Sequence, residues 1–384
     1  MGWPAARSVA AGVPALAARA VGVAEASGLV LAADLWARNP LPPADCSAMD
    51  GWAVRGPGPW RITGRILAGQ QPPAALGEAE AVEVGTGAAV PAGCEGVVPS
   101  EQGVVVGSEL TAAPPRGRHL RRRGEEVPGL TALLPAGTLL NPAAAGLAAA
   151  TGSDTLLVRP RPVVAVLVTG SELVREGLPR EGRIRDALGP MVPALLREAG
   201  ALAGPATPIG DGADLLADAL VAAAATADLV VVTGSTAAGP ADSLRQVVAG
   251  LRSQVLVDGV ACRPGHPMLL AELAGGIRLV GLPGNPLAAL AGALTLAVPM
   301  IWALRGLPAP QLVSCRAART IAAHPSLTRL VPVRRRGGVA LDTGDDGPAM
   351  LLGAATADGV AVLAPGGSVP AGREVGVLEF SPRA

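Results

Sequence analysis

Side chains that can bind metals and phosphates stand directly after two short apolar runs. Thr169-Gly170-Ser171-Glu172 follows the run 163–168, and Thr233-Gly234 follows the run 229–232. Ligands of open α/β sheets bind beyond the carboxyl ends of the strands. A carboxylate just past such an end, as Glu172 would be, is well placed to hold a divalent cation against phosphates. We therefore expect a metal- and phosphate-binding edge at these turns.

Two further carboxylates lie in the same part of the chain. Asp186 precedes a helical pattern over 191–198, where an exposed Asp also serves as an N-cap. Asp211 lies in Gly210-Asp211-Gly212, which is also the composition of a simple turn. For both residues the sequence leaves the structural and the ligand-binding interpretation open.

Two glycine-containing loops could approach an anion closely. The first follows the run 229–232 and contains Gly234, Ser235 and Gly239, with Asp242 three residues later. A Gly/Ser loop between a strand and a helix is in principle an anion cradle, although one such loop is weak evidence. The second, Pro283-Gly284-Asn285-Pro286, follows the run 278–281; its prolines fix the backbone and its glycine permits close approach of a ligand.

Arginine supplies nearly all of the positive charge near these motifs. Arg121, Arg122 and Arg123 stand beside Glu125 and Glu126 in a dense charge cluster. The cluster is either a solvated face or an arginine fork that clamps oxyanions and is held in place by the acids.

A second basic motif is Arg263-Pro264-Gly265-His266-Pro267. Arg263 is permanently charged, whereas a histidine changes its charge near neutral pH. His266 taken alone is typical of a hydrogen-bonded structural residue.

Two turn-like segments nearer the N-terminus carry a carboxylate and a hydroxyl. Asp50 lies in Ser47-Ala48-Met49-Asp50-Gly51, a sequence that fits a plain type I turn. Thr86-Gly87-Ala88 can offer a hydroxyl and bare backbone N–H groups to an anion. It can equally be a turn that ends a strand.

The elements that must position these residues follow from periodicity. Strand, glycine turn and helix alternate over 161–310, which predicts a parallel sheet with helices on both faces, a three-layer α/β core. Short Val-rich runs between Pro and Gly predict a β-rich inserted domain, and the C-terminal part returns to short β runs. Helical spacing over 1–40 and 136–152 predicts an N-terminal helical or linker domain. We expect domains at 1–41 plus 131–160, 42–130, 161–310 and 311–384.

Composition excludes several function classes. The 384 residues hold 31 Lys+Arg and 31 Asp+Glu, so the chain lacks the basic excess of a nucleic-acid binder. Four cysteines without a C-x-x-C pair are typical of reduced, cytosolic thiols. The apolar stretch 287–304 contains a proline and is interpreted as a buried helix rather than a membrane span. We expect a cytoplasmic protein that binds neither nucleic acid nor membrane.

Taken in order, these motifs resemble the MoeA/gephyrin E-domain family of molybdopterin molybdenumtransferases. The resemblance covers essentially the whole chain. It rests on Pro40-Leu41-Pro42-Pro43 with Ser47 to Val54, Thr86-Gly87-Ala88 with Val90-Pro91-Ala92-Gly93, Arg121 to Glu125, Thr169 to Leu173, Arg263 to Pro267, and Leu282 to Pro286.

The resemblance implies a cytosolic homodimer with a MogA-like α/β core, whose clefts are lined by both subunits. It would insert molybdate into adenylylated molybdopterin and release AMP, with Mg²⁺ or another divalent cation bridging phosphates and carboxylates. The upstream molybdopterin adenylyltransferase is a possible partner. The implied roles are metal binding for Glu172, Asp211 and Asp242, charge neutralisation for Arg121 and Arg263, and action from the partner subunit for Asp50. Substrate contacts are implied for Thr86, Asp186, Gly234, Ser235, Gly239, His266, Pro283, Gly284, Asn285 and Pro286.

The chain departs from the family pattern toward less charge or polarity. Ser171 stands where the family usually has Asp, Leu188 and Ser235 replace Asn and Gly, and Gly259 and His266 replace two lysines. These departures suit an alternative, a paralogue that binds a pterin or the molybdenum cofactor as carrier or scaffold. A third interpretation is an enzyme for a different nucleotide-activated pterin.

Overall fold

The computed structural model describes residues 1–72, 74–180, 182–234 and 243–381. Contacts divide the chain into two compact units. Unit 1 comprises Met1–Arg19, Gly28–Ala32 and Val158–Ala384, and unit 2 comprises Ala20–Ser27 and Ala33–Leu157. The four finer domain boundaries stay a prediction.

A seven-stranded sheet forms the centre of unit 1. Its order is β17-β14-β19-β23-β22-β20, with β18 also paired to β14. The apolar runs expected as strands are β14 (Val163–Thr169), β19 (Leu229–Thr233) and β23 (Arg278–Leu282), and these three pair in parallel. The short parallel strands on their outer side are β17 (Leu202–Ala203) and β18 (Thr207–Ile209).

The sheet is not parallel throughout, which corrects the sequence expectation. β20 (Gln254–Asp258) and β22 (Leu269–Glu272) pair antiparallel, and so do β22 and β23. Only Leu273–Ile277 separates β22 from β23, with Gly275 and Gly276 both at positive φ. Such a short connection can join only antiparallel neighbours, because a parallel crossover needs a dozen or more residues.

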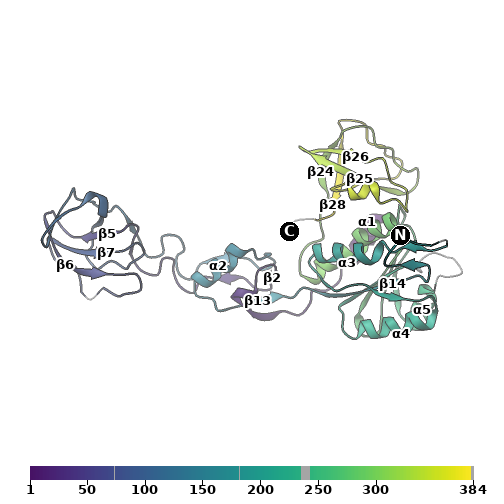
Figure 1. The fold of residues 1–384 in the computed structure, drawn as a ribbon, viewed down its shortest axis with the longest axis horizontal. Helices are drawn as coiled ribbons and strands as arrows, with labels where there is room; N and C mark the ends of the chain where they lie inside the picture. Colours follow the sequence, from purple (N-terminus) through teal and green to yellow (C-terminus); the bar gives the residue numbers. More distant parts are fainter. Residues whose placement is uncertain (73, 181, 235–242, 382–384) are drawn as a thin grey trace. The chain divides into compact units, whose positions relative to one another are not determined.

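Helices cover both faces of this sheet, as a three-layer core requires. Leu216 and Leu220 of α4 (Ala213–Ala224) and Leu244 of α5 (Leu244–Gly250) pack in one cluster with Val230 and Val232 of β19. On the other face α3 (Leu188–Glu198) packs on β14 and α6 (Pro286–Gly292) on β23. Figure 1 shows α4 and α5 on one side of β14 and α3 on the other. The expected three-layer α/β core is thereby confirmed.

The long apolar segment after β23 is an internal helix. α6 continues through a π-helical stretch, η4 (Ala293–Ala297), into α7 (Val298–Leu304). Pro286–Leu304 is long and apolar enough to cross a membrane, but residues 287–304 are all buried within the protein. Among the described residues it is the one candidate span, and its burial confirms the buried-helix expectation.

The N-terminal region is helical only at its start. α1 (Trp3–Ala11) packs against η4 and α7, with Trp3 Nε1 donating to Thr295 Oγ1 at 2.9 Å. The prediction of helix for the rest of 1–40 is wrong, because the chain there forms short strands. β1 (Arg19–Gly22) and β2 (Val30–Leu31) flank β13 (Thr155–Arg159) in the order β1-β13-β2, around a single 3₁₀ turn, η1 (Val23–Glu25).

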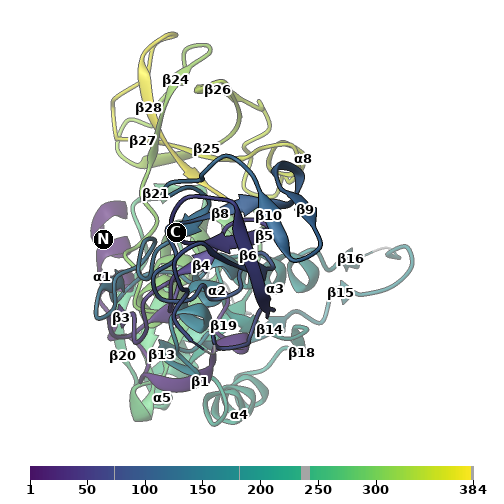
Figure 2. The same ribbon diagram turned by 90° about the vertical axis from the view of Figure 1, so that its left-hand side faces the viewer.

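The C-terminal part of unit 1 is a small β-barrel, as expected for an all-β domain. Strands follow the order β21-β25-β26-β24-β28-β27, and a further pairing of β25 with β27 closes the ring. Figure 2 shows these strands grouped together. Their bounds are β21 (Cys262–Arg263), β24 (Val313–Ala317), β25 (Thr328–Arg336), β26 (Val339–Asp342), β27 (Gly359–Leu363) and β28 (Glu374–Glu379), with α8 (Leu352–Ala355) before β27.

Unit 2 is β-rich with one helix, which agrees with the expected inserted β region. Its main sheet has the order β8-β5-β7-β6-β10-β9, and two small sheets pair β11 with β4 and β12 with β3. α2 (Pro142–Ala150) starts where Asn141 accepts a hydrogen bond from Ala144 N and proline occupies the first turn. The strands are β3 (Leu35–Trp36), β4 (Cys46–Ser47), β5 (Gly51–Val54), β6 (Trp60–Ile66), β7 (Glu80–Val84), β8 (Gly96–Pro99), β9 (Val104–Val106), β10 (Glu109–Thr111), β11 (Leu120–Arg121) and β12 (Ala132–Leu134), with a 3₁₀ turn, η2, at Ser100–Gln102.

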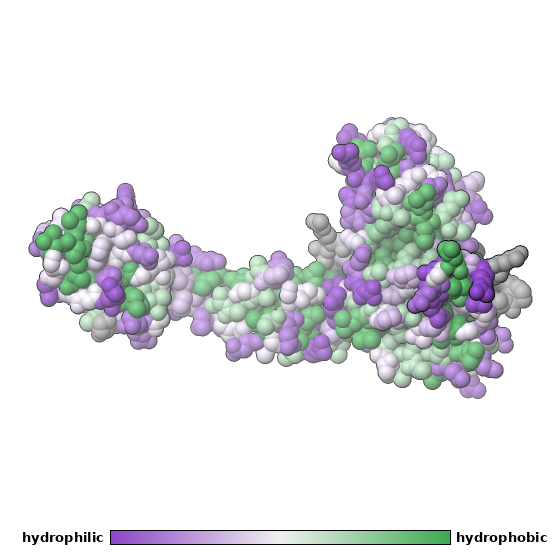
Figure 3. All heavy atoms as spheres, viewed as in Figure 1, coloured by the Kyte–Doolittle hydropathy of each residue, from purple (hydrophilic) through white to green (hydrophobic). Residues whose placement is uncertain are grey.

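On the face that is visible in Figure 3, neither unit carries a single kind of side chain throughout. Figure 3 shows hydrophilic residues interspersed with hydrophobic ones over the visible face. This mixture accords with the equal numbers of acidic and basic residues. A site on this face would therefore be set by local geometry rather than by a broad charged surface.

Candidate functional site

The carboxyl ends of the three central parallel strands meet at one edge of the sheet. Thr233 stands in register with Val168 on one side and Leu282 on the other. Gly234 N donates to Leu282 O at 3.0 Å, and Thr169 Oγ1 donates to Thr233 O at 2.9 Å. Gly170, Gly234 and Pro283, which directly follow these strands, therefore lie side by side.

Gly234 is required by this close approach. Its φ is +81°, and a Cβ there would lie 2.5 Å from Thr169 Oγ1. Neither the backbone conformation nor the space accepts a side chain. Gly284 lies nearby in ordinary van der Waals contact, since a Cβ on it would lie 3.7 Å from Gly234 Cα. Bare backbone at these two glycines therefore stands at the edge of the sheet.

Two of the three predicted metal ligands lie at this edge. Ser171 N donates to Asp211 Oδ2 at 3.1 Å, and Asp211 N donates to Ser171 Oγ at 3.2 Å, which fixes the two loops together. Glu172 folds back over Gly170, where a Cβ would meet its carboxylate oxygens at 2.7 and 2.9 Å. Glu172 and Asp211 thus come from neighbouring loops and offer carboxylate oxygens, the ligands preferred by Mg²⁺.

The rest of the predicted metal set is not tested by this geometry. Asp242, Ser235 and Gly239 lie outside the described residues. Within the described ranges, no group of three His, Cys, Asp or Glu side chains could hold a metal ion. Among the described residues this edge therefore offers the two carboxylates of Glu172 and Asp211, and metal binding by them stays a prediction.

Asp186 takes the structural role that the sequence left open. Its Oδ1 accepts a hydrogen bond from Gly189 N at 2.8 Å in the first turn of α3. The residue also lines a cavity of about 560 Å³ with Arg175, Arg185 and Arg197. Asp186 thus holds the first turn of α3 although the N-cap position belongs to Ala187, and the substrate contact stays a prediction.

The predicted basic motif and the proline loop meet around one cavity. Arg263, His266, Pro283 and Asn285 all line a cavity of about 500 Å³ in unit 1. Gly265, at φ +105°, packs so closely that a Cβ would lie 3.2 Å from the Ala288 carbonyl. Beneath the motif, burial raises the pKa of the Cys262 thiol to about 12, so this thiol stays protonated and takes no part.

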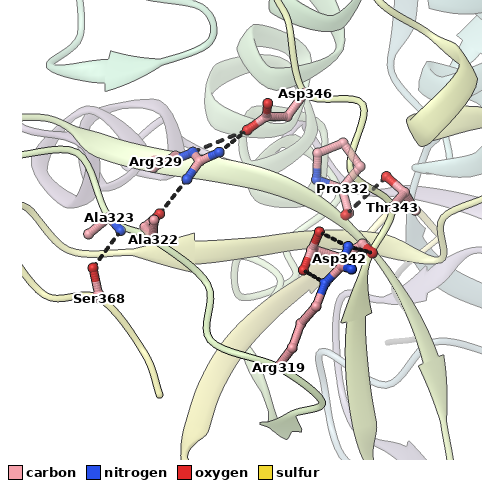
Figure 4. A network of polar contacts seen from close by, with 9 residues as sticks. All are labelled: Arg319, Ala322, Ala323, Arg329, Pro332, Asp342, Thr343, Asp346 and Ser368. Carbon is pink, nitrogen blue, oxygen red and sulfur yellow. Dashed lines mark hydrogen bonds and ion pairs between the residues drawn. The ribbon is translucent and has the colours of Figure 1, made fainter. Parts of the chain in front are cut away.

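Sequence reasoning missed the opposite wall of this cavity. The C-terminal barrel supplies His324, Arg329 and Asp346. Arg329 Nε donates to Asp346 Oδ2 at 3.1 Å, its NH2 group contacts the same oxygen, and its NH1 group donates to Ala322 O at 2.5 Å. Figure 4 shows Arg329 directed toward Asp346. A signal in the sequence that could have pointed to His324 is the scarcity of histidine: the chain has three, and two of them line this cavity.

A second group of predicted residues assembles in unit 2. Thr86 donates to Asp50 Oδ1 from its backbone N at 2.6 Å and from its hydroxyl at 2.8 Å. These bonds, that from the backbone N–H foremost, hold the pKa of Asp50 below its ordinary range, so the carboxylate is ionised at neutral pH. Both side chains are exposed.

Arg121 lies beside the segment that leads to Asp50. It pairs in β11 with Cys46 of β4, three residues before Met49. With Leu41, Pro42, Glu125 and Glu126 it lines a cavity of about 470 Å³.

The neighbouring arginines of the charge cluster have partners. Arg122 NH1 donates to Asp45 Oδ2, and Arg123 N donates to Asp45 Oδ1, each at 2.7 Å. These hydrogen bonds, that from Arg123 N foremost, lower the pKa of Asp45. Within the part of the chain that the structure describes, Arg121 has no such partner. Arg123 donates from its Nε to Pro43 O at 3.1 Å and contacts Asp45 only through its backbone. The cluster therefore combines Arg122, whose guanidinium is paired with Asp45, with Arg121, whose guanidinium has no partner within the described ranges.

Comparison with known proteins identifies the family. The family models that match are the MoeA N-terminal region (domain I and II) at 4–152, a probable molybdopterin binding domain at 165–303 and the MoeA C-terminal region (domain IV) at 314–380. A molybdopterin molybdenumtransferase 2 from Mycobacterium tuberculosis is 35% identical over 308 residues, 76% of each chain. The chain belongs to the MoeA family.

Other relatives agree with this assignment. A molybdopterin molybdenumtransferase from Staphylococcus aureus is 32% identical over 276 residues, 68% of this chain and 66% of its own. A solved MoeA protein from Pyrococcus horikosii superposes with a TM-score of 0.82 at 25% identity, covering 99% of both chains. The MoeA resemblance and its multidomain fold are thus confirmed.

Proposed function

We propose that this MoeA-family chain is a molybdopterin molybdenumtransferase that acts in molybdenum cofactor biosynthesis. It inserts molybdate into adenylylated molybdopterin and releases AMP. The observation that carries the proposal is the meeting of Glu172, Asp211, Gly234 and Pro283 at one sheet edge. The names of the relatives favour the enzyme over a carrier that lacks insertion chemistry.

Each group has a part that its surroundings support. Glu172 and Asp211, with Asp242, would hold a divalent cation, Mg²⁺ in the first instance, whose charge would offset that of the phosphates. Arg263 neutralises phosphate or molybdate oxygens in the cavity of about 500 Å³. The bare backbone at Gly234 and Gly284 lets the ligand approach the strand ends.

The unit 2 residues act in the cleft of a second subunit. Asp50 is ionised and exposed, and Arg121 is available, so both could meet a ligand. We propose a cytoplasmic homodimer in which Asp50 and Arg121 of one subunit complete the site of the other, with the adenylyltransferase as the supplier of substrate.

An AMP-release assay tests the activity. Purified protein is given adenylylated molybdopterin, molybdate and Mg²⁺, and AMP is measured with and without each component. We expect release that depends on molybdate and on the cation. Tight binding of the pterin nucleotide without AMP would contradict the enzyme and support the carrier.

Mixing two inactive variants tests the shared cleft. Asp50→Asn and Glu172→Gln subunits are mixed under conditions that allow subunit exchange. If the two residues serve one cleft from different subunits, each heterodimer keeps one intact site, and about a quarter of the wild-type rate returns. Each variant alone is the control. Absence of any recovery, with exchange shown by light scattering of tagged subunits, would place both residues in a cleft of one subunit.

A further inference from the structure

The helix α6 contacts both predicted loops that line the cavity of about 500 Å³. Toward the loop after β21, a Cβ on Gly265 would lie 3.2 Å from Ala288 O and 3.5 Å from Ala291 Cβ. Toward the loop after β23, a Cβ on Gly292 would lie 3.0 Å from Leu282 Cδ2 at the end of that strand. Because packing at both contacts is this tight, a displacement of α6 would displace the loops as well.

The helix that continues from α6 has an interruption in its backbone hydrogen bonds. In the π-helical stretch η4 a carbonyl accepts from the residue five positions later, as Ala293 O does from Val298 N. The next carbonyl in this register is Leu294 O, whose donor would be residue 299. That residue is a proline and has no N–H. A buried carbonyl without a donor costs about as much free energy as a lost hydrogen bond, so Leu294 O needs a donor from outside the helix.

Arg7 of α1 supplies this donor. Its NH1 group donates to Leu294 O at 2.6 Å, and its NH2 group donates to Pro310 O at 2.8 Å. The side chain is buried, and its guanidinium carbon lies 5.1 Å from the centre of the Trp3 ring. Both of these hydrogen bonds end on backbone carbonyls rather than on a carboxylate. The guanidinium therefore compensates for the donor that the proline removes from the helix.

A second chain of hydrogen bonds joins α1 to the same part of this helix. Trp3 Nε1 donates to Thr295 Oγ1 at 2.9 Å, and Thr295 Oγ1 donates to Ala291 O at 2.7 Å. Trp3 and Thr295 are both buried. Ala291 is also the residue whose Cβ lies against Gly265. α1 is thus connected through η4 to the packing contact that supports one wall of the cavity.

We propose that Arg7 is a positioning residue for this site, because it holds η4 in the π-helical form that places α6 against both loops. Return of η4 to an α-helical register would turn α6 relative to α7 by about 100°, the rotation of one residue. Both packing contacts of α6 would then be lost. The effect on turnover rests on the proposed function, whereas the effect on α6 does not.

Restoring the missing N–H tests the proposal directly. Arg7→Met removes the guanidinium but keeps a long side chain, and Pro299→Ala gives Leu294 O a donor within the helix. In Arg7→Met we expect the α6 amides to exchange hydrogen for deuterium about tenfold faster, as measured by mass spectrometry of peptides. The double variant Arg7→Met/Pro299→Ala should return to nearly the wild-type rate. Exchange that stays fast in the double variant, or that never quickens in Arg7→Met, would overturn the role of Arg7.

Arg305→Met is the matched control. Arg305 is also buried and also donates to backbone carbonyls, those of Ala199 and Gly28, neither of which belongs to α6. Its loss should lower the urea midpoint of unit 1 as Arg7→Met does, but should leave exchange in α6 unchanged. Equal quickening in both variants would show a general loss of stability and would overturn the positioning role. Should Arg7→Met not fold, Arg7→Lys keeps one donor group and should give an intermediate rate that Pro299→Ala again restores.

Steady-state kinetics with adenylylated molybdopterin test the consequence for the site. Arg7→Met should raise KM by about tenfold and lower kcat by less than about threefold, since the loops that bind substrate are displaced. The double variant with Pro299→Ala should restore KM. An unchanged KM beside faster exchange in α6 would overturn the positioning role while the enzyme stands. A wild type that releases no AMP would contradict the proposed function, and the exchange rates would still decide whether Arg7 holds α6.

Discussion

Two arginines that line cavities in different units differ in what already binds them. Arg329 in unit 1 uses Nε and both terminal nitrogens on Asp346 and the Ala322 carbonyl. Arg121 in unit 2 makes no hydrogen bond or ion pair within the described ranges, although it stands beside two acids. The first side chain fixes the cavity wall, whereas the second can offer its whole guanidinium to an oxyanion.

The comparison shows that the number of charges near a cavity does not measure its capacity for anions. In the cluster Arg121 to Arg123 the guanidinium of Arg122 is paired with Asp45, and in the other cavity Asp346 offsets the charge of Arg329. The capacity of a cavity to bind an anion depends on a guanidinium whose N–H donors have no partner in the protein. If this is correct, substitution of an arginine without a partner should lower activity more than substitution of an arginine that is already paired.

The largest effect is expected at the strand-end edge. Glu172→Gln keeps the side-chain shape but removes the charge that would hold the cation, so turnover should fall by about 100-fold or more. Circular dichroism and light scattering should show an unchanged fold and assembly. Glu176→Gln, an exposed acid on the same connection, is the matched control and should keep its activity. Unchanged turnover in the Glu172 variant would remove this residue from the mechanism.

Arg121→Gln tests the available arginine. We expect kcat/KM to fall by about tenfold to 100-fold, because a charge-assisted contact to the substrate is lost. The unfolding midpoint should not move, since no partner is left behind. Arg122→Gln breaks only a half-exposed pair with Asp45 and should change kcat/KM little. Equal loss in both variants would contradict the division of this cluster.

Gly234→Ala tests the packing of the strand ends. A positive φ and a contact of 2.5 Å with Thr169 Oγ1 should lower the free energy of unfolding of unit 1 by about 2 kcal/mol. Urea unfolding followed by fluorescence measures this loss. Gly146→Ala in α2 has open space and is the control, with an expected gain of about 0.5–1 kcal/mol. An unchanged free energy of unfolding in Gly234→Ala would mean that the backbone at Gly234 and Thr169 shifts to make room for the methyl group.

Arg329→Gln tests the tied arginine. It leaves Asp346 without its partner in a half-buried wall, so we expect a loss of about 1 kcal/mol in the free energy of unfolding. The loss of activity should be smaller than for Arg121→Gln, which a parallel AMP-release assay would measure. The reverse order of the two activities would contradict the comparison of the two cavities.

The smallest effect concerns the pH response of Asp50. Thr86→Val removes the hydroxyl donor but keeps the stronger backbone N–H bond, so the pKa of Asp50 should rise part of the way toward its ordinary range. A lowered pKa contributes stability above the ordinary range of Asp, and this contribution is lost as the pH falls through the folded value. Carbon-13 NMR of the Asp50 carboxyl group would measure the change. A fall in its pKa would contradict the hydroxyl as donor.

Local sequence patterns predict the part of the fold and site that depends on neighbours in the chain. The apolar runs before Thr169, Thr233 and Leu282 became β14, β19 and β23, and parallel pairing alone brings their loops together. The contact of Asp186 with the first turn of α3 likewise agrees with a structural role, one of the two interpretations available from the sequence. These features need no information from distant segments.

Features that depend on distant partners escaped prediction. The strand β2 pairs with β13, more than a hundred residues later, so the apolar spacing over 1–40 was taken for a helix. Arg329 and Asp346 belong to strand and loop sequences that carry no motif, and they reach the cavity because the barrel closes through β25 and β27. Arg121 could not be separated from Arg122 and Arg123 without knowing where Asp45 lies.

The discontinuity of unit 1 has a consequence for how the chain is made. Arg7 of α1 donates to the carbonyls of Leu294 and Pro310, and burial lowers its pKa to about 10. Both partners of Arg7 are synthesised long after Arg7 itself, because they lie beyond the whole of unit 2 in the chain. Residues 33–157, by contrast, find the rest of unit 2 within that stretch or just before it. On the ribosome, unit 2 can fold first while the N-terminal helix waits for a partner about 290 residues downstream. During this interval α1 is the segment that a chaperone would bind, and a nascent chain truncated before residue 294 would leave α1 without its partners.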